Sequence, residues 1–175
     1  TYSNDTNQTI NYYLSDVKRN SEKKLHEIKE RRGTGKLKFL DIKGYNGQNE
    51  EVTVFSCGEK ISFKIMLDKV LGNGRIKGRI DIGINNQNDV RIAWLSTSMF
   101  FDYINQQDDE IIFKIDRFPL SPGSYTVNIY CEVEGEVADW LENFYTFEIA
   151  ESDFYLTGKK IPMGQGYIFL DYKVL

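Results

Sequence analysis

The stretch SYTVNIYCEV, residues 124–133, decides the fold class of this chain. Apolar and polar side chains alternate along it, which is the period of a β-strand with one buried face. The pattern directs one set of side chains inward: Tyr125, Val127, Ile129, Cys131 and Val133. The other set faces outward: Thr126, Asn128, Tyr130 and Glu132.

Segments with the same period lie on both sides of this stretch. They cover residues 37–42, 59–67, 79–84, 90–95, 111–115, 145–149 and 167–174. Turn residues separate them, including the Asn-rich run 85–89 and Pro122-Gly123. Because no helical segment lies between the strands, the pattern predicts an all-β fold, an antiparallel sandwich over residues 32–175.

Residues 1–31 differ from the rest of the chain. Over 9–31 the period becomes helical, with a narrow apolar stripe made by Ile10, Leu14, Val17, Leu25 and Ile28. Charged residues fill the other faces, and Gly33 and Gly35 end the segment. We therefore expect an N-terminal amphipathic linker helix ahead of the sandwich.

Composition excludes several classes of partner. The net charge is −4 and the pI is near 5.1, which argues against a nucleic-acid partner. No run of about 18 apolar residues is present, so no membrane span is predicted. The spacing of Cys57 and Cys131 around Trp94 is too long for an immunoglobulin-type disulfide. We expect both to be free thiols in a reducing compartment.

A search for catalytic chemistry finds none. The single histidine, His26, lies on the charged helix, which excludes triads built around histidine and leaves no zinc site. The acidic groups 108–110 and Glu132, Glu134 and Glu136 could bind a hard cation, but solvated acidic loops and strand ends are the favoured interpretation. No phosphate-binding loop is present. We expect a binding module without ATPase activity, metal or cofactor.

The outward side chains are the candidate site. Arg79, Asp81, Asn128 and Tyr130 combine planar polar groups with a ring, the mixture that sugars require. A solvated sheet face would look similar. Trp94 is expected to cluster with Phe100, Phe101 and Tyr103, and Trp140 is expected in a loop; each could instead cap the core. Tyr125, after Pro122-Gly123, is interpreted as a structural corner tyrosine.

Six short elements resemble one family in their order and spacing. They are RGTGKL (32–37), SCGEKISF (56–63), IGI (82–84) with its Asn-rich turn, FPLSPGSY (118–125), Asp139-Trp140 and GQGYI (164–168). Together they resemble the C-terminal carbohydrate-binding domain of the Wzt-type ATP-binding subunit of ABC transporters that export O-antigen polysaccharide. One departure is visible, because the family's last strand often ends in Trp and this chain ends in Val174-Leu175.

The resemblance implies an immunoglobulin-like or jelly-roll sandwich at the cytoplasmic face of the inner membrane. Such a domain would recognise the modified non-reducing end of a lipid-linked glycan. It would work with an upstream ATP-binding domain and a membrane permease, and residues 9–31 would be the linker from that ATPase domain. Family members form dimers, some by exchanging the last strand, and we expect residues 166–174 to do so here.

Two other classes of function remain as alternatives. One is a secreted carbohydrate-binding or adhesion domain with a sandwich fold, against which the two expected free thiols argue. The other is a β-sandwich hydrolase, which would need two carboxylates about 5–10 Å apart across a cleft. No motif supports the hydrolase.

Overall fold

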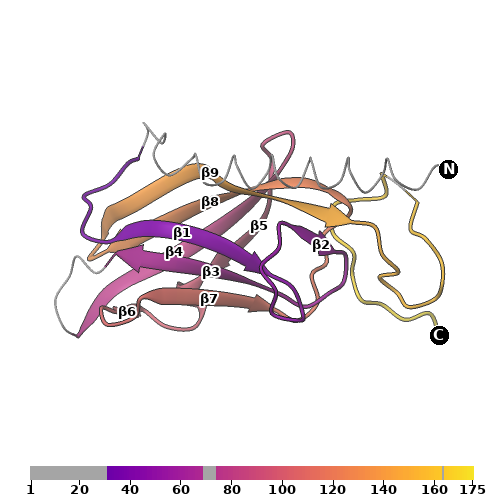
Figure 1. Cartoon of the computed structure of the whole chain (residues 1–175), viewed down its shortest axis with the longest axis horizontal. Coiled ribbons are helices and arrows are strands. Elements are labelled where there is room, and N and C mark those ends of the chain that lie inside the picture. Colours follow the sequence, from indigo (N-terminus) through magenta and orange to yellow (C-terminus); the bar gives the residue numbers. More distant parts are fainter. Residues whose placement is uncertain (1–30, 69–73, 163) are drawn as a thin grey trace.

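The computed structural model describes residues 31–68, 74–162 and 164–175 of the 175-residue chain. The predicted linker helix lies outside these residues except for Arg31, and His26 lies outside them too. Within the described residues the chain is all-β, and its antiparallel sheets form a sandwich-like fold (Figure 1). The predicted fold class is confirmed.

The smaller sheet has three antiparallel strands. They are β1 (Lys38–Tyr45), β3 (Ile61–Asp68) and β7 (Glu110–Ile115), in the order β1-β3-β7. In β3, Ile61, Phe63, Ile65 and Leu67 are buried as their alternation predicts. This sheet therefore contributes one apolar face to the core.

The larger sheet has six strands: five follow the order β2-β9-β8-β4-β5, and β6 pairs with the start of β4. Their bounds are β2 (Val54–Ser56), β9 (Glu136–Ala150), β8 (Gly123–Val133), β4 (Arg75–Asn86), β5 (Arg91–Ser96) and β6 (Tyr103–Asn105). All pairs are antiparallel except β2 with β9. A short 3₁₀ helix, η1 (Thr97–Met99), follows β5.

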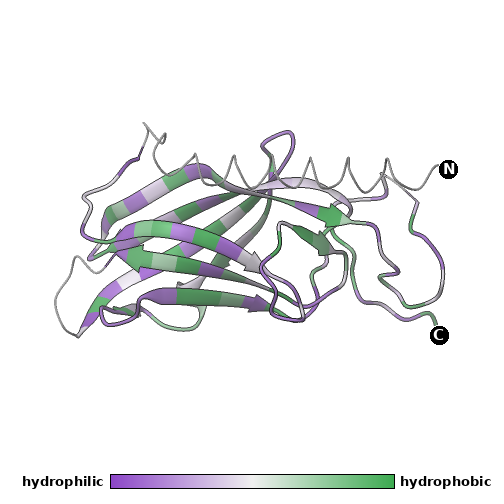
Figure 2. Ribbon diagram, in the orientation of Figure 1, coloured by the Kyte–Doolittle hydropathy of each residue, from purple (hydrophilic) through white to green (hydrophobic). Residues whose placement is uncertain are grey.

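The core lies between the two sheets. Hydrophilic and hydrophobic residues alternate along the strands, as the period-two pattern requires (Figure 2). Aromatic rings join the layers: Phe63 of β3 lies 5.5 Å from Phe147 of β9 and 6.0 Å from Phe55 of β2, measured between ring centroids. Edge-on and tilted geometry of this kind adds to the energy of area burial.

The predicted corner tyrosine is confirmed. Tyr125 is 2% exposed, and its hydroxyl donates to the Ser121 backbone oxygen at 2.9 Å. Its ring stacks on Phe147. The residue thus ties the 118–123 turn to the core.

Both cysteines are free, as the spacing predicts, and both are buried. Cys57 lies in a turn between β2 and β3 but is only 4% exposed. The polar residues beside it in the sequence therefore did not indicate that its side chain is buried. Burial raises the pKa of Cys57 to about 11 and that of Cys131 to about 12.

Two of the sequence-based strand predictions are wrong in extent. β9 begins at Glu136 rather than near Tyr145, so Trp140 lies in a strand and not in a loop. Residues 167–174 form no strand in this chain; a single bridge joins Ile168 to Leu120. Leu170, Tyr172 and Val174 are 70%, 67% and 87% exposed, because no neighbouring strand pairs with them.

Candidate functional site

Strand register places all six predicted site residues on one face of the larger sheet. Tyr130 of β8 lies opposite Asp81 of β4 and Trp140 of β9. Gly83, two residues along β4, lies opposite Asn128 of β8 and Trp94 of β5. Because neighbours in register project from the same side, these side chains share the face that points away from the core, called here the outer face. Arg79 joins them at the next outward position of β4.

Arg79 and Tyr130 form the centre of this face. The guanidinium carbon of Arg79 lies 5.5 Å from the Tyr130 ring centroid, within the range of a cation–π contact. Arg79 also pairs with Glu132 at 3.2 Å and with Asp81 at 3.4 Å. Burial lowers the pKa of Arg79, but the carboxylates of Asp81 and Glu132 outweigh this effect, so the pKa is raised. The cation is therefore neutralised by its neighbours.

Tyr130 is held in place from two further sides. Its hydroxyl donates to Glu132 Oε2 at 3.2 Å, and its ring meets Trp140 edge-on at 6.2 Å between centroids. Burial, followed by the nearby carboxylate of Glu132, raises the pKa of Tyr130. The hydroxyl thus stays protonated and keeps its donor role at physiological pH.

Trp140 continues the row of rings toward the edge of β9. The Arg32 guanidinium carbon lies 4.9 Å from the Trp140 ring centroid, and the backbones of the two residues bridge. The entry segment 32–35 can lie this close to β9 because Gly33 has no side chain: a Cβ there would be 2.4 Å from the Ala138 backbone oxygen. Sequence reasoning missed Arg32, which no strand pattern marked.

Two outward positions of β4 are less accessible than their alternation predicts. Asp81 is 7% exposed and Asn85 is 4% exposed. Asp81 Oδ1 accepts a hydrogen bond from Ser96 Oγ at 2.6 Å, while its other oxygen faces Arg79. β4 is a central strand, so long side chains from its neighbours cover it. Asp81 therefore positions Arg79 and the start of η1 rather than presenting a free carboxylate.

Trp94 and Asn128 extend the face away from Tyr130. Trp94 is 48% exposed. It lies two strands across the sheet from Tyr130 and two residues along the strand direction. Standard strand spacing and rise put the two residues roughly 12 Å apart. Asn128 Oδ1 accepts from the Asn143 backbone amide at 2.7 Å, which holds the irregularity of β9 at that point. Its amide nitrogen forms no hydrogen bond to another described residue.

The predicted aromatic cluster around Trp94 does not form. Phe100 and Phe101 follow η1 and are 87% and 49% exposed, and Tyr103 lies in β6 against the start of β4. No ring contact joins these residues to Trp94 among the contacts of the described part of the chain. By register, Trp94 and Tyr103 lie on the outer face, because Tyr103 pairs with Lys77, two residues before Arg79 on β4.

The outer face has the chemistry of a sugar-binding surface. Half-buried rings at Tyr130 and Trp140 offer flat apolar area for the C–H face of a sugar, with Trp94 as a separate ring. Guanidinium and amide groups between them can bond hydroxyls in pairs.

Comparison with known proteins identifies the family. The family model described as the Wzt C-terminal domain matches residues 28–161. The chain belongs to this family. The crystal structure of the C-terminal domain of Wzt shares its fold, with a TM-score of 0.65 and 12% sequence identity over 85% of this chain and 89% of that one. Membership supports a carbohydrate-binding role associated with an ABC transporter.

Other solved structures are more distant from this Wzt C-terminal domain. The PmoD soluble domain from Methylocystis has a TM-score of 0.41 and 8% identity, covering 63% of this chain and 90% of that chain. The DNA glycosylase AlkC of Pseudomonas fluorescens, bound to DNA with an abasic site analog, has a TM-score of 0.39 and 15% identity, covering 66% and 30%. No curated protein matches the sequence.

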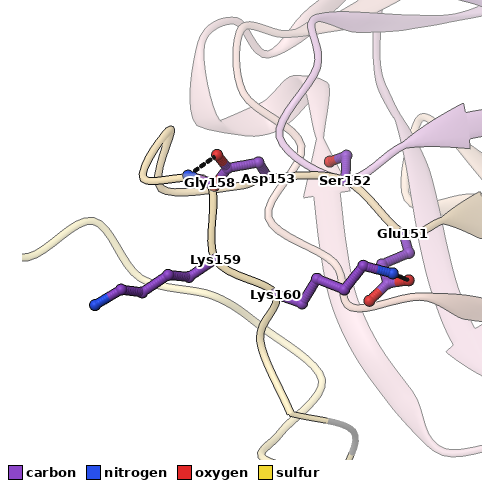
Figure 3. A pocket seen from close by; sticks show the side chains of 6 residues that line it. All are labelled: Glu151, Ser152, Asp153, Gly158, Lys159 and Lys160. Atoms are coloured by element: carbon purple, nitrogen blue, oxygen red, sulfur yellow. Dashed lines mark hydrogen bonds and ion pairs between the residues drawn. The ribbon is translucent and has the colours of Figure 1, made fainter.

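A hollow beyond β9 offers no comparable site. It is lined by Glu151, Ser152, Asp153, Gly158, Lys159 and Lys160 (Figure 3). Lys160 pairs with Glu151 at 2.8 Å, and Asp153 accepts from the Gly158 amide at 2.5 Å. The charges of Glu151, Asp153 and Lys160 are therefore already satisfied within the loop.

Residues 31–68, 74–162 and 164–175 contain neither a metal-binding cluster nor a membrane-spanning helix. No three His, Cys, Asp or Glu side chains converge there as a metal site would require. No helix in these segments has the length and hydropathy needed to cross a lipid bilayer.

Proposed function

We propose that this domain binds the modified non-reducing end of a lipid-linked O-antigen-type polysaccharide and selects it for export by an ABC transporter. The outer face around Tyr130 is the binding surface. Arg79, Trp140, Asn128 and Trp94 contribute to it, and Asp81 holds Arg79 in position. The domain acts at the cytoplasmic face of the membrane, next to an ATP-binding domain and a permease.

The observation that carries this proposal is the arrangement of Tyr130 between Trp140 and Arg79. Two rings and a guanidinium, fixed by contacts at 6.2 Å and 5.5 Å, form a pre-ordered surface. Their order is set by strand register and by Glu132, so little conformational entropy remains to be lost on binding. Membership of the Wzt C-terminal domain family supports a glycan as the ligand.

A non-catalytic role is consistent with membership of the Wzt C-terminal domain family. The residues of the outer face bind and orient the glycan, and the neighbouring domain hydrolyses ATP. Free, buried Cys57 and Cys131 favour this assignment over a secreted adhesion domain, where disulfides are the usual use of cysteine pairs.

The proposal includes a homodimer that exchanges the C-terminal segment. In a single chain, Ile168 bridges Leu120 and Phe169 packs on Phe154, but Leu170, Tyr172 and Val174 stay mostly exposed. An edge strand of a second copy would pair with that segment and cover Leu170, Tyr172 and Val174. Exchange of an identical element is a low-cost route to a two-fold dimer.

Titration calorimetry with polysaccharide purified from the source organism tests the function. We expect the purified chain to bind the intact polysaccharide and to bind much more weakly after its terminal modification is removed. Equal binding of both forms would contradict recognition of the modified end. Shortening of the polysaccharide during the titration would instead support the hydrolase alternative.

A further inference from the structure

Arg91 lies flat on the outer face of β4, at a position that sequence reasoning did not mark. Its guanidinium covers Gly83: a Cβ built on that glycine would lie 2.2 Å from Cζ, 2.3 Å from Nη1 and 2.7 Å from Nη2. Three such similar distances place the plane of the guanidinium against the strand. Only glycine leaves room for this contact, which explains a glycine between Ile82 and Ile84 in a central strand.

The orientation of Arg91 is fixed by the loop that precedes it. Its Nε donates to Asn85 Oδ1 at 2.6 Å, and the Asn85 amide nitrogen donates to Asp89 Oδ1 at 2.8 Å. Asn85 is 4% exposed, so the anchor is itself held in place. The side chain thus loses most of its rotamer freedom before any ligand arrives.

The two terminal nitrogens of Arg91 are free. Neither forms a hydrogen bond or an ion pair to any residue in the described part of the chain, and the residue is exposed. Arg79 on the same face differs, because Asp81 and Glu132 neutralise it. Arg91 therefore offers an unpaired positive charge with the two-pronged donor geometry that fits planar oxyanions.

We propose that Arg91 binds an oxyanion carried by the polysaccharide, either a sugar carboxylate or a phosphate ester. This inference rests on the proposed function, and it adds that the glycan is acidic where it contacts Gly83. Trp94 and Asn128 lie in register on either side of Gly83, so a ring and an amide flank the guanidinium. The acidic sugar packs against Trp94 while its oxyanion accepts from both terminal nitrogens of Arg91.

An anion fits this position better than a neutral hydroxyl pair does. A guanidinium holds a carboxylate or a phosphate through two parallel charge-assisted hydrogen bonds, which adds both energy and a fixed geometry. Asn128 and Arg79 already provide donors for neutral hydroxyls elsewhere on the face.

The test uses three forms of polysaccharide purified from the source organism. One is intact, one has its carboxyl groups reduced to alcohols, and one has its phosphate esters removed with hydrofluoric acid. We expect one of the two treatments to weaken binding by about 10- to 100-fold, as loss of a charged hydrogen-bonding pair implies. The treatment that weakens it identifies the oxyanion as a carboxylate or a phosphate.

Two variants separate charge from geometry. Arg91→Gln removes the charge, whereas Gly83→Ala keeps it but pushes the guanidinium off the strand with a methyl group. Both variants should bind the intact polysaccharide as weakly as the unmodified protein binds the form that has lost its oxyanion. Neither variant should bind the intact form more tightly than that treated form. Arg75→Gln is the matched control, because Arg75 is an exposed arginine at the far end of β4 that pairs with β6. Thermal unfolding of each variant confirms an intact fold.

The results separate this inference from the function on which it rests. If the unmodified protein binds all three polysaccharides equally, or if Arg91→Gln binds the intact form normally, the oxyanion site is wrong and the glycan-binding function stands. If the unmodified protein binds none of them, both proposals fail.

Discussion

Arg31 and Asp139 form an ion pair that ties the entry segment to β9. The Asp139 carboxylate is 1% exposed and also accepts a hydrogen bond from the Phe39 backbone amide at 2.7 Å. The hydrogen bond with Asp139 raises the pKa of Arg31, against the lowering effect of burial. One buried carboxylate thus joins the start of the domain, β1 and the strand that carries Trp140.

Removal of this carboxylate should destabilise the domain. We expect Asp139→Ala to lower the free energy of unfolding by about 3 kcal/mol, because it leaves Arg31 and the Phe39 amide without their shared partner. Urea denaturation measures the change. Glu142→Ala is the control: its ion pair with Arg32 is 3.8 Å long and exposed, so its loss should cost less than about 1 kcal/mol. Similar effects of both changes would contradict a special role for Asp139.

Tyr130 should contribute to glycan affinity through its ring. By analogy with stacking on bases, Tyr130→Ala should weaken binding by roughly 1–3 kcal/mol. Tyr130→Phe keeps the ring and loses only the bond to Glu132, so it should bind nearly normally. Calorimetry of both variants against the intact polysaccharide measures the difference. An unchanged affinity for Tyr130→Ala with an intact fold would move the binding site to Trp94 or Trp140.

Gly44 should not tolerate a methyl group. A Cβ at this position would lie 2.4 Å from Phe55 Cζ and 2.7 Å from the Tyr145 hydroxyl oxygen, inside the aromatic core. We expect Gly44→Ala to reduce the free energy of unfolding by about 1–3 kcal/mol through overpacking. Gly47→Ala serves as the control, since its Cβ would be 3.5 Å from its nearest neighbour. Thermal unfolding measures the difference. Equal melting temperatures for the two variants would show that the core accommodates a methyl group at Gly44.

The buried thiols should make the fold sensitive to alkali. An unfolded thiol loses its proton near pH 8.5, whereas burial holds the pKa of Cys57 at about 11 and that of Cys131 at about 12. Between these limits the unfolded state binds fewer protons, so stability is fully present below pH 8.5 and falls as pH rises. Urea denaturation at pH 7.5 and pH 10 should show this loss. A variant carrying Cys57→Ala and Cys131→Ala should lose less stability between these two pH values. An equal loss would assign the effect to other groups, such as Tyr125 and Tyr145, whose pKa values burial also raises.

The C-terminal segment should control assembly. Deletion of residues 164–175 removes the exposed Leu170, Tyr172 and Val174, and we expect it to abolish the dimer or the solubility of the protein. Light scattering at micromolar concentration measures the mass. Leu170→Asp is a milder variant that keeps the length of the segment, and Lys173→Ala is its control. A full-length monomer would contradict the dimer, and a soluble truncated protein of unchanged oligomeric state would contradict strand exchange.

Local alternation was enough to predict the sandwich and most of its strands. In 124–133 and 59–67 every apolar side chain that the pattern directs inward is buried, because one face of each strand meets the core and the period of two is a property of the backbone. The short elements shared with the Wzt-type domains predicted the family, which the family model confirms. The outward direction of Arg79, Tyr130 and Asn128 followed from the same alternation.

Strand register and side-chain packing decided what alternation could not. Asp81 points outward yet is buried, because long neighbours cover a central strand, and Arg91 reaches Gly83 only across two paired strands. Trp140 joins Tyr130 because β9 starts earlier than its apolar pattern indicates. Residues 167–174 alternate like a strand, but only residues 167–169 pair with another segment of this chain, residues 119–121. The sequence by itself determined which side chains prefer to be buried, a local property, whereas only the tertiary structure decided which of them meet, because pairing joins residues far apart in the chain.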